Sequence, residues 1–206
     1  MAADGQAARG QKTSGTFPGS LPFTFTTRSG TTLEGHLLTA SDLEGLQRFN
    51  ADLSDFSRGV FLPHAYDLET LSRYAERNRA GKDRAFVLYR GEELVGYYFL
   101  WDFDQPAPVL GIGLADAWQG QGLGRLMLRH LIEEARRAGR DAIELTTGLG
   151  NERAFRLYRR VGFELVGEVD NVAGDGRIVR ERRMFLPLKP GVQPVERSFE
   201  PPTSPA

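Results

Sequence analysis

The chain has 206 residues, with 26 lysines and arginines against 27 aspartates and glutamates, and it has no cysteine. Its length suits one domain with a substantial core. The near-zero net charge gives no indication of a nucleic-acid or membrane partner, and the lack of cysteine excludes disulfides, thiolate nucleophiles and cysteine-based metal sites. No apolar run reaches membrane-spanning length and the N-terminus lacks a signal-peptide core. We therefore expect a soluble, cytoplasmic protein.

The first third of the chain predicts a tail, a hairpin and two helices. Residues 1–20 are rich in small and polar residues with almost nothing to bury, which predicts disorder. Residues 23–39 alternate between apolar and polar side chains around a turn, as in a β-hairpin. Helical spacing follows over residues 41–53 and 67–78, and Asp67 is the expected N-cap of the second helix. Residues 54–66, between these helices, have no clear period.

The rest of the chain reads as strands around two further helices. Apolar or alternating runs predict strands at residues 84–89, 94–101, 109–114, 141–147, 163–169 and 178–188. One helix is expected from Leu123 and another after Asn151. The order indicates a single mixed α/β domain over residues 21–188. A proline-rich tail is expected at 189–206; its lone aromatic residue, Phe199, could dock on the domain, but we prefer a solvated tail.

A glycine-rich turn stands between the strand at 109–114 and the helix that begins at Leu123. Glycines occupy alternate positions at 120, 122 and 124. A strand, a glycine turn and a helix N-terminus direct several backbone N–H groups and the positive end of the helix dipole at one point. Such a point favours a phosphate group.

Two other interpretations of this turn stay open. A plain tight turn, in which glycines only reverse the chain, has about equal weight when the turn is taken alone. A dinucleotide-binding fold is the other, because Glu144 lies near the offset of its ribose-binding acid. The glycine spacing differs from G-x-G-x-x-G, however, and too little chain follows for a doubly wound sheet.

The motif Gln119-x-x-Gly122-x-Gly124 resembles the acyl-CoA-binding motif of the GCN5-related N-acetyltransferase (GNAT) superfamily. Residues 151–163, a helix that ends in Tyr-x-x-x-Gly-Phe, resemble the second signature of that family, in the family's order and at its usual separation. The resemblance covers about residues 84–188. It implies a GNAT-like mixed sheet of about six to seven strands flanked by about four helices.

The resemblance implies acetyl-CoA as the co-substrate and no metal ion. A splayed strand edge can pair with the amide-rich pantetheine arm, and by resemblance that edge is Ile112 to Leu114, where a backbone N–H would steady the thioester oxygen. The cofactor-binding residues implied in this way are Ile112, Gly113, Leu114, Gln119, Gly120, Gln121, Gly122, Leu123, Gly124, Arg125, Asn151 and Tyr158.

Tyr158 matches the family tyrosine that stands beside the CoA sulfur, and we take it as a catalytic residue. Its position on an apolar helix face also fits a core ring with no part in chemistry. Proton transfer from a phenol of pKa about 10 to a thiolate of pKa about 8.5 is uphill by roughly 2 kcal/mol. We therefore expect a hydrogen bond to the developing thiolate rather than full proton transfer.

The general base is less clear from the sequence. Family members that resemble the ribosomal-protein N-terminal acetyltransferases carry a glutamate at the position of Thr146. Glu144, two residues earlier on the same strand face, is our candidate; Asp102 and Asp104 are alternatives, and each of the three also fits a solvated surface charge. Freeing an α-amine at neutral pH costs about 1 kcal/mol and a lysine about 4 to 5. A missing glutamate thus fits an easily deprotonated amine or a water-mediated base.

The remaining polar candidates carry little information. None of His36, His64 and His130 has a spaced partner for a metal ion, and His64, in the unassigned loop, is the one to watch. The arginine-rich stretch 177–183 reads as a solvated strand edge, with contact to an anionic substrate as the minority interpretation.

We therefore expect an acetyl-CoA-dependent N-acetyltransferase that transfers acetyl to a primary amine by direct attack in a ternary complex. Its acceptor would be a small molecule or a peptide, and the protein a monomer or homodimer without nucleic-acid or membrane partners. The alternative is a non-catalytic acyl-CoA-binding module with a regulatory role. The presence of Thr146 where the resemblance implies a glutamate makes that alternative conceivable. The retention of both Asn151 and Tyr158 argues against it.

Overall fold

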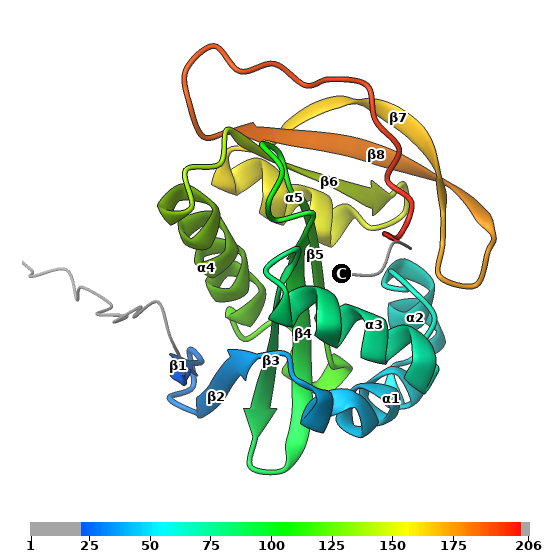
Figure 1. Cartoon of the computed structure of the whole chain (residues 1–206). Helices are drawn as coiled ribbons and strands as arrows, with labels where there is room; N and C mark the ends of the chain where they lie inside the picture. The colour runs from blue at the N-terminus through cyan, green and yellow to red at the C-terminus, as the bar shows by residue number, and fades with distance from the viewer. Residues whose placement is uncertain (1–21, 203–206) are drawn as a thin grey trace, which may run out of the picture.

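The computed structural model describes residues 22–202 (Figure 1), so the predicted N-terminal tail, residues 1–20, lies outside the described residues. In the described part, eight strands form one sheet in the order β1-β2-β3-β4-β5-β6-β8-β7. They are β1 (Phe23–Thr26), β2 (Thr32–Leu37), β3 (Arg84–Arg90), β4 (Glu93–Trp101), β5 (Val109–Leu114), β6 (Ala142–Gly148), β7 (Glu164–Val172) and β8 (Ile178–Pro187). The predicted mixed α/β fold is confirmed, with a sheet larger than six or seven strands.

Five α-helices cover the two faces of this sheet, one more than predicted. They are α1 (Leu43–Asp52), α2 (Asp55–Val60), α3 (Leu68–Arg79), α4 (Leu123–Arg137) and α5 (Glu152–Val161). The additional helix, α2, lies in the region without a clear period, where the Ser54 side chain caps it by accepting from the Ser57 N–H. Figure 1 shows α1 and α3 on one side of the sheet and α4 on the other. No helix within residues 22–202 is long and apolar enough to cross a membrane.

The central strands are buried on both faces. Leu88 and Tyr98 belong to the apolar cluster under α4 and α5, whereas Val87 and Tyr97 belong to the cluster under α1 and α3. This explains why β3 and β4 read as nearly continuous apolar runs rather than as alternating strands. The predicted caps are also confirmed: the Asp67 carboxylate accepts from the Thr70 N–H at 2.9 Å.

The sheet has one weak joint, between β5 and β6. Strand β5 pairs with β4 from Val109 to Leu114, but its parallel pairing with β6 is confined to Val109 and Glu144. The Glu144 N–H donates to the Pro108 carbonyl at 3.0 Å, which closes this joint. Beyond it the strands diverge, so within residues 22–202 Ile112 has no paired strand on the β6 side. The sheet thus consists of two parts, β1–β5 and β6–β8–β7.

The segment after β8 does not behave as the solvated tail that we expected. The side chain of Phe199 is only 7% exposed, and the Tyr74 hydroxyl of α3 donates to the Pro202 carbonyl at 3.3 Å. Figure 1 shows this red segment returning from β8 toward α3. The expectation was wrong because the contacts of Phe199 are with residues far away in the sequence. The domain boundaries that we set at 21 and 188 stay a prediction.

Candidate active site

A cavity of about 1060 Å³ lies where β5 and β6 diverge. Ten of the twelve predicted cofactor-binding residues line it: Ile112, Gly113, Leu114, Gln119, Gly120, Gly122, Gly124, Arg125, Asn151 and Tyr158. The other two do not. The Gln121 side chain donates to the Ala117 carbonyl at 2.9 Å, and Leu123 is fully buried beneath the turn. We call the part of the cavity formed by the β5 edge, residues 119–125 and the first turn of α5 the cofactor half.

The glycine turn needs glycine for backbone reasons. Gly120 has φ of 81° and Gly122 has φ of 92°, in the left-handed region that side chains disfavour. Gly122 is also the N-cap of α4 and brings no side-chain oxygen to the first turn of that helix. The first backbone N–H groups of α4 are therefore left without a side-chain cap. This geometry suits an anion at the helix N-terminus.

Two arginines that sequence reasoning missed add positive charge at this turn. The Arg28 N–H, in the turn after β1, donates to the Gln121 carbonyl at 3.2 Å, and its side chain lies 3.4 Å from where a Cβ on Gly122 would stand. Arg153 lines the cavity from α5. Together with Arg125 they complement a polyphosphate ligand. Because these arginines come from separate segments, no local pattern identifies them.

Gln119 organises the turn as much as it lines the cavity. Its Nε2 donates to the Leu114 carbonyl and to the Ser57 hydroxyl, each at 3.1 Å. Its Oε1 accepts from Arg153 at 3.0 Å. One side chain thus joins the end of β5, helix α2 and helix α5.

The β5 edge presents backbone groups to the cavity. The Ala115 N–H donates to the Val95 carbonyl of β4 at 2.9 Å. Because the direction of backbone groups alternates along a strand, the N–H and carbonyl of Ile112 point away from β4. Ile112 lines the cavity, so this peptide edge can pair with an amide-bearing ligand.

At the first turn of α5, Asn151 caps the helix as predicted, and its side-chain oxygen accepts from the Ala154 N–H at 3.2 Å. Tyr158 is 7% exposed, and its ring centroid lies 5.8 Å from that of Phe163, yet the residue also lines the cavity. Burial, and secondly the negative charge of Glu181, raise the pKa of the phenol. Tyr158 therefore stays protonated at neutral pH and keeps an O–H that can donate a hydrogen bond. The sequence left open whether Tyr158 is a buried core residue or lines a site; in the structure it is buried and also lines the cavity.

Glu144 does not reach the cavity, as a general base would have to do. It is fully buried, and its Oε2 accepts from Arg183 Nε at 2.8 Å and Nη2 at 2.6 Å. It is absent from the cavity lining, whereas Thr146 lines the cavity. This placement argues against Glu144 as the base and favours a structural ion pair beside the β5–β6 joint.

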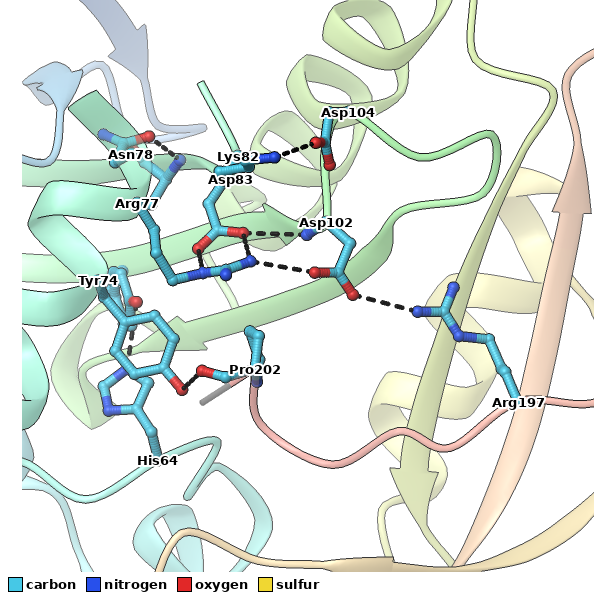
Figure 2. A network of polar contacts seen from close by, with 12 residues as sticks. His64, Tyr74, Arg77, Asn78, Lys82, Asp83, Asp102, Asp104, Arg197 and Pro202 are labelled. Carbon is cyan, nitrogen blue, oxygen red and sulfur yellow. Dashed lines mark hydrogen bonds and ion pairs between the residues drawn. The ribbon is translucent and has the colours of Figure 1, made fainter. Parts of the chain in front are cut away.

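Neither alternative aspartate lines the cavity. Asp104 pairs with Lys82 at 2.9 Å. Asp102 lies in the polar network of Figure 2, where it accepts from Arg77 at 3.0 Å and pairs with Arg197 at 3.3 Å. In the same network Arg77 also binds Asp83 at 2.7 Å. The network ties the segment after β8 to helix α3 and to the end of β4.

The other end of the cavity, which we call the acceptor half, has an aromatic wall. It is lined by Phe61, Phe99, Trp101 and Phe199. Phe199 is held between two cations, with the guanidinium carbon of Arg183 at 5.3 Å and that of Arg197 at 5.6 Å from its ring centroid. Residues from the loop after α2, from β4 and from the C-terminal segment thus meet in one wall.

The β7–β8 turn closes the acceptor half from another side. The Gly174 N–H donates to the Leu62 carbonyl at 2.8 Å. A Cβ on Gly174 would stand 2.3 Å from the backbone carbon of His64, so only glycine allows this approach.

The three histidines make contacts that support the fold. His64 is 2% exposed; its Nδ1 donates to the Ala65 carbonyl at 2.8 Å, which leaves Nε2 to accept from the Tyr97 hydroxyl at 3.1 Å. Burial lowers the pKa of His64, and likewise that of His130, to about 4. His36 pairs with Asp42 at 2.9 Å. Across residues 22–202 no three histidines, aspartates or glutamates gather as metal ligands.

The arginine-rich stretch 177–183 is largely engaged in ion pairs. Arg180 pairs with Glu168 at 3.3 Å and with Asp170 at 3.1 Å on β7, and Arg182 pairs with Glu152 at 2.6 Å. These contacts strengthen the β7–β8 hairpin and fix it to α5.

The sequence profile of the Acetyltransferase (GNAT) family matches residues 46–163. The chain is 41% identical over 81 residues to the N-alpha-acetyltransferase RimI of Mycobacterium tuberculosis, which covers 37% of this chain and 49% of that protein. It is 28% identical over 98 residues to the uncharacterized N-acetyltransferase YvbK of Bacillus subtilis, with coverage of 47% and 60%. The chain thus spans about half the length of these curated relatives.

Solved structures share the fold. The structure of yncA from Salmonella typhimurium with its cofactor acetyl-CoA superposes with a TM-score of 0.64, at 20% identity, over 80% of this chain and 99% of that one. At this identity the likeness concerns the fold alone.

Proposed function

Because the chain belongs to the acetyltransferase (GNAT) family, we propose that it is an acetyl-CoA-dependent N-acetyltransferase acting on a primary amine. The observation that carries this proposal is the cavity at the β5–β6 divergence, which joins a free peptide edge to a glycine turn. The turn would hold the pyrophosphate, the Ile112 edge would pair with the pantetheine amides, and the acceptor half would receive the amine.

The transfer proceeds by direct attack in a ternary complex. The amine nitrogen forms a bond to the thioester carbonyl carbon, the carbon–sulfur bond breaks, and sulfur leaves with the electron pair while nitrogen loses a proton. The N–H of Ile112, which points away from β4, would stabilise the charge that develops on the carbonyl oxygen. The Tyr158 hydroxyl donates a hydrogen bond to the departing thiolate. Its raised pKa makes full transfer of the phenol proton still less favourable than in water.

The acceptor that we favour is the α-amine of a peptide. The RimI relative is an N-alpha-acetyltransferase by name, and an α-amine needs only about 1 kcal/mol to be deprotonated at neutral pH. The aromatic wall of the acceptor half also suits an apolar first side chain. A chain without cysteine is compatible with a reducing cytoplasm, where we propose that it acts.

Two measurements test this proposal. Calorimetry with acetyl-CoA reports binding, and release of free CoA in the presence of peptide, polyamine and lysine acceptors reports transfer. We expect binding together with amine-dependent CoA release. Binding without release from any amine would instead favour the non-catalytic acyl-CoA-binding module.

A further inference from the structure

One of the carboxylates that line the cavity lies on strand β8. Glu181 of β8 lines the cavity and is half-buried. In the β6–β8 ladder, Gly148 is opposite Glu181 and Thr146 is opposite Arg183. Opposite residues on paired strands share a face, and residues two apart on one strand do too. Glu181 therefore lies on the same sheet face as Thr146, two ladder positions away.

Asn171 of β7 connects these two side chains. Its Nδ2 donates to Glu181 Oε2 at 2.9 Å and approaches Thr146 Oγ1 at 3.2 Å. Its Oδ1 accepts from the Val172 N–H at 2.9 Å, which fixes the orientation of the amide. A single nitrogen thus positions the Glu181 carboxylate beside Thr146, where the resemblance to the ribosomal-protein N-terminal acetyltransferases implies a glutamate.

Glu181 differs from the other carboxylates in this region by its lack of a cation. Glu144 pairs with Arg183 and Glu152 pairs with Arg182, each at 2.6 Å. No lysine or arginine in the described chain, residues 22–202, forms an ion pair with Glu181. Its charge also acts on the phenol of Tyr158, whose pKa it helps to raise. The carboxylate lines the same cavity as the predicted sulfur-binding side chain, and an arriving amine need not displace a cation from it.

We propose that Glu181 is the catalytic base that accepts the proton of the attacking amine, in place of a glutamate at position 146. This inference rests on the transfer activity proposed above. As the nitrogen–carbon bond forms, positive charge develops on nitrogen, and the carboxylate stabilises that charge and takes the N–H proton. Sulfur leaves with the electrons of the carbon–sulfur bond. Glu181 then returns its proton to solvent, so the net products are the amide, CoA thiolate and one proton.

Glu181→Gln tests the inference because it removes the base and keeps an oxygen that can accept from Asn171. The acceptor is whichever of spermidine, lysine and an alanine-initiated peptide gives wild type the fastest CoA release. We expect kcat to fall at least about a hundred-fold, while the Kd for acetyl-CoA and the melting temperature stay within error. The residual rate should rise with pH as the amine itself loses its proton. Glu181→Asp should recover part of the loss.

Glu164→Gln is the matched control, because Glu164 is an exposed strand carboxylate on β7 outside the cavity. It should leave every parameter unchanged. A kcat of Glu181→Gln within about twofold of wild type, with CoA release intact in wild type, would overturn the role of Glu181 alone. No CoA release from wild type with any amine would overturn the transfer activity, and this inference with it.

Discussion

The two halves of the cavity are built in opposite ways. The cofactor half uses the β5 edge, the backbone of residues 119–125 and the first turn of α5, with Arg28 added from the turn after β1. The acceptor half uses side chains from the loop after α2, from β4, from β8 and from the segment that carries Phe199. Local geometry thus forms most of one half, and long-range packing forms the other. The comparison teaches that a contiguous motif can supply most of an anion-binding geometry, whereas an aromatic wall such as that of the acceptor half requires the whole tertiary structure.

The largest expected effect is on acetyl-CoA affinity, when the cofactor half is disrupted by a substitution in the glycine turn. Gly122→Asp should weaken acetyl-CoA binding at least about a hundred-fold, because it adds a side chain at φ of 92° and a negative charge where an anion must lie. Calorimetry on the folded variant measures this. Gly139→Asp is the control, since Gly139 has φ of 71° at the other end of α4 and faces open space. Equal affinity in wild type and Gly122→Asp would remove the turn from the cofactor site.

A smaller effect is expected where the two halves meet. Tyr158→Phe keeps the buried ring and removes only the donor to the thiolate. A hydrogen bond to a charged atom is worth about 1.5–3 kcal/mol, so kcat should fall roughly ten- to a hundred-fold, with the acetyl-CoA Kd intact. Because the pKa of the phenol is raised, this ratio should be constant from pH 6 to 9. An unchanged kcat with a lower melting temperature would reduce Tyr158 to a core residue.

Acidification tests the packing behind the acceptor half. The pKa of His64 is lowered from 6.5 to about 4 in the fold by burial, so its contribution to stability is present above pH 6.5 and is lost as the pH falls toward 4. Between pH 7 and pH 5 this loss is about 2 kcal/mol. Urea unfolding at both pH values should show a pH dependence about that much smaller in His64→Gln than in wild type. The same pH dependence in both proteins would show that His64 is not kept neutral by the fold.

The smallest effect concerns the aromatic wall. Phe199→Ala should lower kcat/KM for the acceptor about fivefold, which corresponds to roughly 1 kcal/mol of lost apolar contact, and should leave acetyl-CoA affinity unchanged. Val195→Ala is the control in the same segment, because that side chain is 66% exposed. A loss of acetyl-CoA affinity in Phe199→Ala would contradict the separation of the two halves.

The sequence predicted what depends on neighbouring residues. The order of the strands, the glycine turn, helix α4 and the Asn151 cap all follow from short-range patterns, and the structure contains them. Helix α2 was missed because six residues are too few to show a period. The docking of Phe199 depends on contacts with Arg183 and Arg197 that form only in the folded chain.

Which carboxylate lies near Thr146 depends on the register in which β6 pairs with β8, and this register cannot be predicted from the sequence. Glu144 looked available because it lies two residues from Thr146, but its strand pairing buries it against Arg183. Glu181 is far from Thr146 in the sequence and comes next to it only through the antiparallel pairing of β6 with β8. Glu181 could therefore be recognised as a candidate base only from the strand pairing in the folded sheet.

The joint at Val109 and Glu144 has a mechanical consequence. Backbone pairing resists bending of a sheet, and here the ladder between the two parts is confined to Val109 and Glu144, with nearby hydrogen bonds to the Pro106 and Pro108 carbonyls. The sheet therefore resists bending least at this joint, which has the position of a hinge, and a bend there would change the width of the cavity between β5 and β6. The buried Glu144–Arg183 pair lies beside the hinge. It links β6 to β8, so it stiffens the β6–β8–β7 part of the sheet at its border with β5.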